Sequence, residues 1–167
     1  MTDKTSFAPD EWRHLLRSVS LAGVAVTAAS PSGPIGVVKE MFAAGKVVAR
    51  AKSEAPSNKL IGAVAADLAT SEGRAQATQD MNTEFAGASP EQIRSRAIEA
   101  VRRAAAIVDG KADPQDAQAF KLWLRSVSQE VAEAAKEGGF LGIGGVRVSE
   151  AEQAALREIA EALGLPA

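Results

Sequence analysis

Three aspartates around one turn are the residues of this sequence best suited to binding chemistry. Asp109, Asp113 and Asp116 bracket the junction D-G-K-A-D-P-Q-D between two helical patterns. Carboxylate oxygens are the ligands that Ca²⁺ and Mg²⁺ prefer, so the three side chains could hold a divalent cation. They fit equally a turn residue, an N-cap and a favourable charge in the first turn of the next helix. Phe120 stands where an EF-hand loop needs its glutamate, and the sequence leaves the cation and capping interpretations open.

The residue types on which catalytic sites usually depend are scarce in this chain. His14 is the only histidine, and there is no cysteine. Thiol catalysis, cysteine metal sites and the paired Glu-x-x-His motifs of di-iron bundles are therefore excluded. The sequence contains no G-x-S-x-G elbow that would position a serine nucleophile. Because His14 lies beside Trp12 and Leu15, we expect a packing role for it, and we predict neither an enzyme nor a resident cofactor.

A glycine-rich segment, G-G-F-L-G-I-G-G, follows the long helical pattern that begins at Pro114. It does not resemble a phosphate-binding loop, because it follows a helix instead of a strand and no Lys-Ser or Lys-Thr pair comes after it. The apolar side chains of Phe140, Leu141 and Ile143 must either fold back onto the core or contact something else. The three residues are therefore candidates for contact with a protein partner or a membrane surface.

The densest basic cluster consists of Arg94, Arg96, Arg102 and Arg103. Helical spacing places Arg96, Glu99 and Arg103 on one outward face, which is typical of a solvated surface. The formal net charge is −2, and no aromatic residues are interleaved with the arginines. A nucleic-acid partner is therefore not expected, since such binding depends largely on positive charge and base stacking.

Helix-period patterns fill most of the chain and predict an all-α fold, a compact bundle of about six to seven helices. The first helix is expected from Pro9 to about Ala29, a second from Ile35 to about Glu54, and a third after a cap at Ser57. Within residues 71–88 the pattern indicates either a short helix near 75–81 or a connector. The first helix should bury Trp12, Leu16, Val19, Gly23 and Val26.

Capping signals define the second half of the chain. Ser89 with Gln92, and Ser149 with Glu152, fit capping boxes, while Gly110 in a left-handed conformation would end the helix that precedes Asp113. The helix after Pro114 should bury one stripe and expose the opposite one. The buried stripe is Phe120, Leu124, Val127, Val131 and Ala134, and the exposed stripe is Lys121, Arg125, Gln129 and Glu133.

A single domain over residues 1–167 is the expected organisation for a chain of this length. Residues 7–70 and 89–164 show weak similarity when Pro31 is aligned with Pro114, so they are candidate halves of a duplication joined by residues 71–88. Alanine-rich helices also align by chance. The sequence leaves open whether the halves are true repeats.

The motif V-D-G-K-A-D-P-Q-D-A-Q-A-F at 108–120 resembles the helix junction of the tellurite-resistance TerB-like helical domains. The segment V-R-V-S-E-A-E-Q-A-A-L at 146–156 is similar to a helix opening of the same family. The resemblance implies an all-helical fold with internal pseudo-symmetry and an acidic cation site at Asp109, Asp113 and Asp116. The first half departs from the family, because Val26 and Thr27 stand where Asp-Gly would be.

These observations favour a non-enzymatic interaction or scaffold domain, which the resemblance connects with stress responses. The alternative is a divalent-cation sensor that uses residues 109–116 to bind Ca²⁺ or Mg²⁺. A protein partner is expected, and contact with a membrane surface stays open. The lack of cysteine and of a charged-then-apolar leader favours the cytoplasm.

Overall fold

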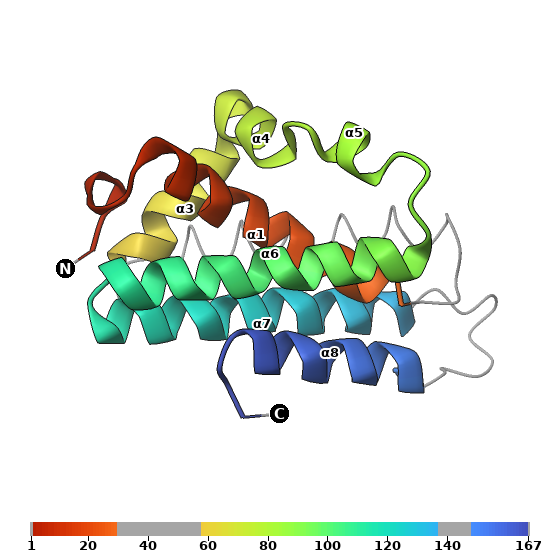
Figure 1. Cartoon of the computed structure of the whole chain (residues 1–167). Helices are drawn as coiled ribbons and strands as arrows, with labels where there is room; N and C mark the ends of the chain where they lie inside the picture. The colour runs from red at the N-terminus through yellow and green to blue at the C-terminus, as the bar shows by residue number, and fades with distance from the viewer. Residues whose placement is uncertain (1, 30–57, 137–147, 167) are drawn as a thin grey trace.

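The structure is a computed structural model, and it describes residues 2–29, 58–136 and 148–166. Every regular element in these ranges is a helix, which confirms the predicted all-α bundle (Figure 1). A short 3₁₀-helix, η1 (Lys4–Ser6), precedes α1 (Pro9–Thr27), and α3 (Lys59–Ala69), α4 (Ser71–Thr78) and α5 (Met81–Phe85) follow. The remaining elements are α6 (Pro90–Lys111), α7 (Pro114–Lys136) and α8 (Glu150–Ala162). None of these helices is long and apolar enough to cross a membrane.

Helix α1 is the centre of the bundle, since it contacts α3, α4, α6, α7 and α8. The helices α6 and α7 form a hairpin, and α8 lies against both of them (Figure 1). The predicted stripe of α1 is confirmed, because Trp12, Leu16, Val19, Gly23 and Val26 are all buried. Its buried face is wider than the stripe and includes Leu15, Leu21, Ala22 and Ala25, as its central position requires.

Both predicted capping boxes are present. The Ser89 hydroxyl accepts the amide hydrogen of Gln92 at 3.2 Å, and the Gln92 side chain accepts the Ser89 amide hydrogen at 2.9 Å. The Ser149 amide donates to the Glu152 carboxylate at 2.8 Å in the same manner. Gly164, in a left-handed conformation with φ of +66°, follows the C-terminal end of α8. These signals are local in sequence, and so they determine helix ends without help from the rest of the fold.

Two predicted boundaries are wrong. The cap of α3 is Asn58, whose side chain accepts the Ile61 amide hydrogen at 3.0 Å; Ser57 lies outside the described residues. Gly110 lies inside α6, which continues to Lys111, and its φ is not positive. Helix α6 ends at Ala112, which has an extended backbone. The next residue, Asp113, is disfavoured from helical conformation because it precedes Pro114, and it serves as the N-cap of α7. Helix α1 ends at Thr27 with Ala28 as its C-cap, close to the end expected near Ala29.

Residues 71–88 form two short helices, α4 and α5, where one short helix or a connector was predicted. The turn into α4 is tight. A Cβ atom on Gly73 would lie 2.0 Å from the carbonyl oxygen of Asp67, so this close approach of α4 to α3 requires glycine. The expected helix at 35–54 lies outside the described residues, and the proposed duplication therefore stays a prediction.

Candidate functional site

The acidic junction between α6 and α7 is occupied by contacts within the protein. The carboxylate of Asp116 accepts hydrogen bonds from the amide nitrogen of Thr2 at 2.8 Å and from the side-chain amide of Asn58 at 3.0 Å. The amide nitrogen of Asp113 donates to the Thr2 hydroxyl at 2.9 Å. The main-chain carbonyl of Asp113 accepts the first helical hydrogen bond of α7, from the Ala117 amide, as that of an N-cap residue does. The junction thus joins the N-terminal segment, α3 and α7.

Asp109, the third candidate cation ligand, pairs with Lys121 instead. The ammonium nitrogen of Lys121 lies 2.8 Å from a carboxylate oxygen of Asp109, and the lysine is only 8% exposed. The prediction that Lys121 belongs to the solvent-exposed face of α7 is therefore wrong. Long basic side chains can bury their methylene groups while the charged end reaches a polar partner, and Lys121 does this across the α6–α7 turn.

Apart from Lys121, the predicted buried and exposed stripes of α7 are largely confirmed. Phe120, Leu124, Val127 and Val131 are buried, and Ala134 is partly buried. On the opposite side, Gln129 and Glu133 are exposed, while Arg125 is partly covered and donates to the carbonyl oxygen of Pro166 at 3.1 Å.

No group of three or more histidine, cysteine, aspartate or glutamate residues is placed to hold a metal ion within the described ranges. Asp109 and Asp116 direct their oxygens to protein donors. The cation site at Asp109, Asp113 and Asp116 stays a prediction that this geometry does not support. Phe140, Leu141 and Ile143, the predicted partner contacts, lie outside the described residues.

His14 is partly buried on α1, as expected for a packing residue. Burial lowers the pKa of its imidazole below the ordinary value, and the charges of Arg103 and Arg17 lower the pKa further. An imidazolium at this position would be desolvated and repelled by two guanidinium groups. The surroundings of His14 therefore favour the uncharged imidazole.

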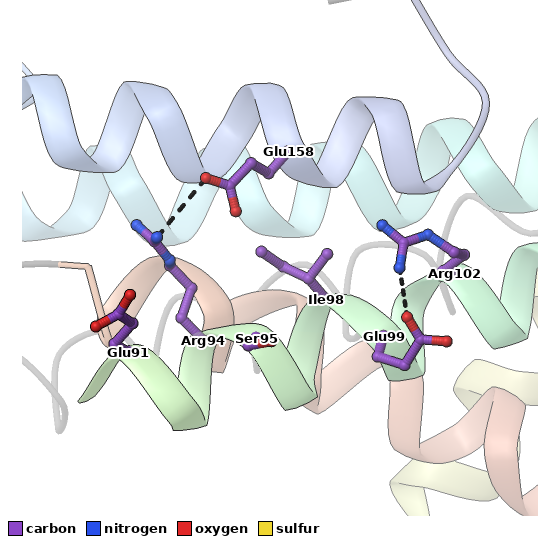
Figure 2. A pocket seen from close by; sticks show the side chains of 7 residues that line it. All are labelled: Glu91, Arg94, Ser95, Ile98, Glu99, Arg102 and Glu158. Carbon is purple, nitrogen blue, oxygen red and sulfur yellow. Dashed lines mark hydrogen bonds and ion pairs between the residues drawn. The ribbon is translucent and has the colours of Figure 1, made fainter. Parts of the chain in front are cut away.

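A groove of about 280 Å³ lies between α6 and α8 (Figure 2). Across it, Arg94 of α6 faces Glu158 of α8, with 3.7 Å between the guanidinium nitrogen and the carboxylate oxygen. Along α6, Arg102 pairs with Glu99. Ile98, which is 6% exposed, supplies the apolar base between these charged groups. Glu91 and Ser95 complete the lining.

No protein-family model, curated protein or solved structure matches this chain. The resemblance of residues 108–120 to TerB-like domains therefore stays an interpretation of the motif. The groove between α6 and α8 has to be interpreted from its own residues.

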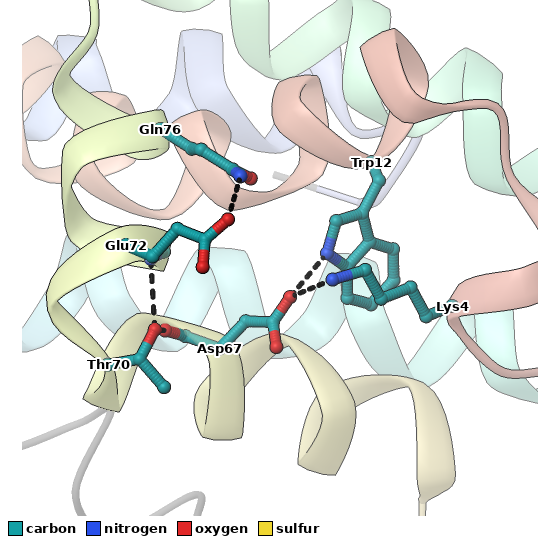
Figure 3. A network of polar contacts seen from close by, with 7 residues as sticks. Lys4, Trp12, Asp67, Thr70, Glu72 and Gln76 are labelled. Carbon is teal, nitrogen blue, oxygen red and sulfur yellow. Dashed lines mark hydrogen bonds and ion pairs between the residues drawn. The ribbon is translucent and has the colours of Figure 1, made fainter.

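A second polar site, at Asp67 of α3, joins three elements near the N-terminus (Figure 3). One oxygen of Asp67 accepts from the Trp12 indole nitrogen at 2.8 Å and from the Lys4 ammonium at 2.7 Å. Partial burial raises the pKa of the Asp67 carboxyl, but the hydrogen bonds from Lys4 and Trp12 outweigh it and leave the pKa below its ordinary value. Thr70 then caps α4 by accepting the Gly73 amide hydrogen at 2.9 Å.

The sequence contained only part of the signal for these sites. Arg94 and Arg102 stood out as members of a basic cluster, but Glu158 and the groove did not, because the two helices that form it are far apart in sequence. Asp67 was missed for the same reason, since its partners lie 55 and 63 residues away along the chain. An amphipathic pattern shows which face is buried, and it does not show which charged residues meet.

Proposed function

We propose that this protein is a non-enzymatic helical interaction domain whose α6–α8 groove receives a helix of a partner protein. The observation that carries the proposal is the arrangement of charge in the groove. Arginine and glutamate face each other from two different helices over an apolar base at Ile98 (Figure 2). Such a surface offers charge pairs that select the register and orientation of a partner.

The ion pair across the groove is suited to exchange with a partner. The side chains of Arg94 and Glu158 are 29% and 42% exposed, and their closest atoms are 3.7 Å apart. Ion pairs of this exposed kind contribute about 0–1 kcal/mol to stability. A partner that supplies its own glutamate to Arg94, or its own lysine to Glu158, therefore replaces the internal pair at little cost.

Site-specific photo-crosslinking tests this proposal. A photoreactive amino acid replaces Ser95 at the groove, and the matched control replaces Ser71 of α4, an exposed helical serine away from α8. We expect a protein adduct in extracts of the source organism from position 95 and not from position 71. The adduct should disappear when Arg94→Glu and Arg102→Glu are added. Equal labelling from both positions, or labelling that survives the charge reversal, would contradict the proposal.

Other proposals rest on the sequence alone. They are membership of the TerB-like helical domains, a stress-related role and a cytoplasmic location. The divalent-cation sensor at residues 109–116 gains no support from the contacts of Asp109 and Asp116, and a direct test of cation binding is described in the Discussion.

A further inference from the structure

Helix α6 contributes a narrow row of residues to the α6–α8 groove, here called the α6 stripe. It consists of Glu91, Ser95, Ile98 and Arg102, which all line the groove (Figure 2). Because successive members are four, three and four residues apart, they lie within an arc of about 60° around the helix axis. The stripe extends about 17 Å along that axis, so it presents one straight row of side chains to a helix that enters the groove.

The two charged ends of the α6 stripe are available to partners from outside the chain. The side chain of Glu91 is exposed, and within the described ranges it makes no hydrogen bond or ion pair. Arg102 pairs with Glu99 of its own helix, but these side chains are 56% and 67% exposed, and ion pairs of this kind add little to stability. Both Glu91 and Arg102 can therefore take an external partner of opposite charge at little cost.

The order of residues in the α6 stripe is complementary to itself. A two-fold axis midway between Ser95 and Ile98 sets a second copy of α6 antiparallel to the first. Glu91 then lies opposite Arg102 of the second copy and Ser95 opposite Ile98, and each contact occurs twice, as two-fold symmetry requires. An ion pair forms at both ends of the contact, and the small serine leaves room for isoleucine at its centre. A shift of one helical turn would set Glu91 against Ile98, so the charges select this register.

We propose that the helix received by the α6–α8 groove is α6 of a second copy of this chain, in an antiparallel, two-fold symmetric dimer. The inference rests on the proposed function and names the partner that the groove binds. The α6 stripe is shorter than a standard protein interface requires, so the dimer is weak and dissociates on dilution. Its specificity comes from the ion pairs between Glu91 of each copy and Arg102 of the other.

Sedimentation equilibrium of the purified full chain tests the dimer through charge complementation. Glu91→Arg and Arg102→Glu should each weaken self-association at least about tenfold, because each sets two pairs of like charges against one another. An equimolar mixture of the two variants should associate as wild type does, since each variant supplies the charge that the other lacks. The matched control is Glu72→Arg, which changes an exposed glutamate in the first turn of α4 and should leave self-association unchanged. Thermal melts check that the three variants are folded, and a folding defect would not be restored by mixing.

Two results would overturn the dimer. One is a wild-type chain that remains monomeric at about 1 mM, where even a weak specific dimer is populated. The other is a mixture of Glu91→Arg and Arg102→Glu that associates no more than the separate variants, which would assign self-association to another surface.

The photoreactive residue in place of Ser95 separates failure of the dimer from failure of the proposed function. In the purified chain it should give an adduct of twice the monomer mass. An adduct with a different protein from extracts, while the purified chain stays monomeric, would contradict the dimer and leave the groove as a binding site. No adduct of either kind would contradict both.

Discussion

The ammonium group of Lys121 reaches the carboxylate of Asp109 across the α6–α7 turn, at 2.8 Å, from a side chain that is almost fully covered. Because Asp109 is about half exposed, most of the stabilisation should come from packing of the lysine methylenes. We expect Lys121→Ala to reduce the free energy of unfolding by about 1–2 kcal/mol, and Lys121→Met by less than about 1 kcal/mol. Urea melts measure both, with the exposed Gln118→Ala as control. Equal losses in Lys121→Ala and Gln118→Ala would contradict the burial of Lys121.

Replacing Gly110 or Gly164 by alanine should change the stability of the protein in opposite directions. Gly110 is helical, and a Cβ atom there meets nothing within 4 Å, so Gly110→Ala should stabilise the protein by up to about 1 kcal/mol. Gly164 has a φ of +66°, a conformation that alanine adopts only with strain. Gly164→Ala should therefore destabilise it by about 1 kcal/mol. Thermal unfolding of the two variants gives the comparison. A destabilised Gly110→Ala would restore the left-handed helix stop first predicted at this position.

Asp67 should make stability depend on acidity. Its pKa in the folded protein lies below the ordinary value of 3.8. The stabilisation is therefore fully present above the unfolded pKa and is lost as the pH falls through the lowered folded value. The difference in stability between wild type and Asp67→Asn should be largest near neutral pH and shrink toward pH values below 3.8. Chemical denaturation across that range measures it. A difference independent of pH would show that the charge of Asp67 has no role in holding Lys4 and Trp12.

Divalent cations should not stabilise this protein through its acidic junction. Asp116 accepts hydrogen bonds from Thr2 and Asn58, so its oxygens already serve a structural purpose. We expect Asp116→Ala to cost about 1–3 kcal/mol, because it leaves two donors without their acceptor. Ca²⁺ and Mg²⁺ should leave the melting temperature of wild type unmoved. A cation-dependent rise that Asp116→Asn abolishes would instead support the cation sensor.

The comparison of sequence with structure separates local from long-range information. The capping boxes at Ser89 and Ser149 were predicted correctly because each is complete within four consecutive residues. The stripe around Leu124 was also predicted, since a helical period reports which face is buried. Lys121 was misassigned because its burial depends on Asp109 of the neighbouring helix.

The contacts of the acidic junction also could not be predicted from local sequence. Its spacing allowed either a cap or a cation site, and the contacts with Thr2, 114 residues away from Asp116, could not be inferred from that spacing. The groove between α6 and α8 was not predicted for the same reason. Its two opposing charges, Arg94 and Glu158, meet only after the helices pack.

The measurement that most directly tests the proposed function exchanges the two charges of the groove. The double variant Arg94→Glu, Glu158→Arg keeps the net charge and keeps an ion pair across the groove, but it inverts the pattern that a partner meets. Its thermal melt should match wild type, while its affinity for the protein captured at Ser95 should fall about tenfold or more. If the exchanged variant binds that protein as tightly as wild type does, the α6–α8 groove is not the binding surface.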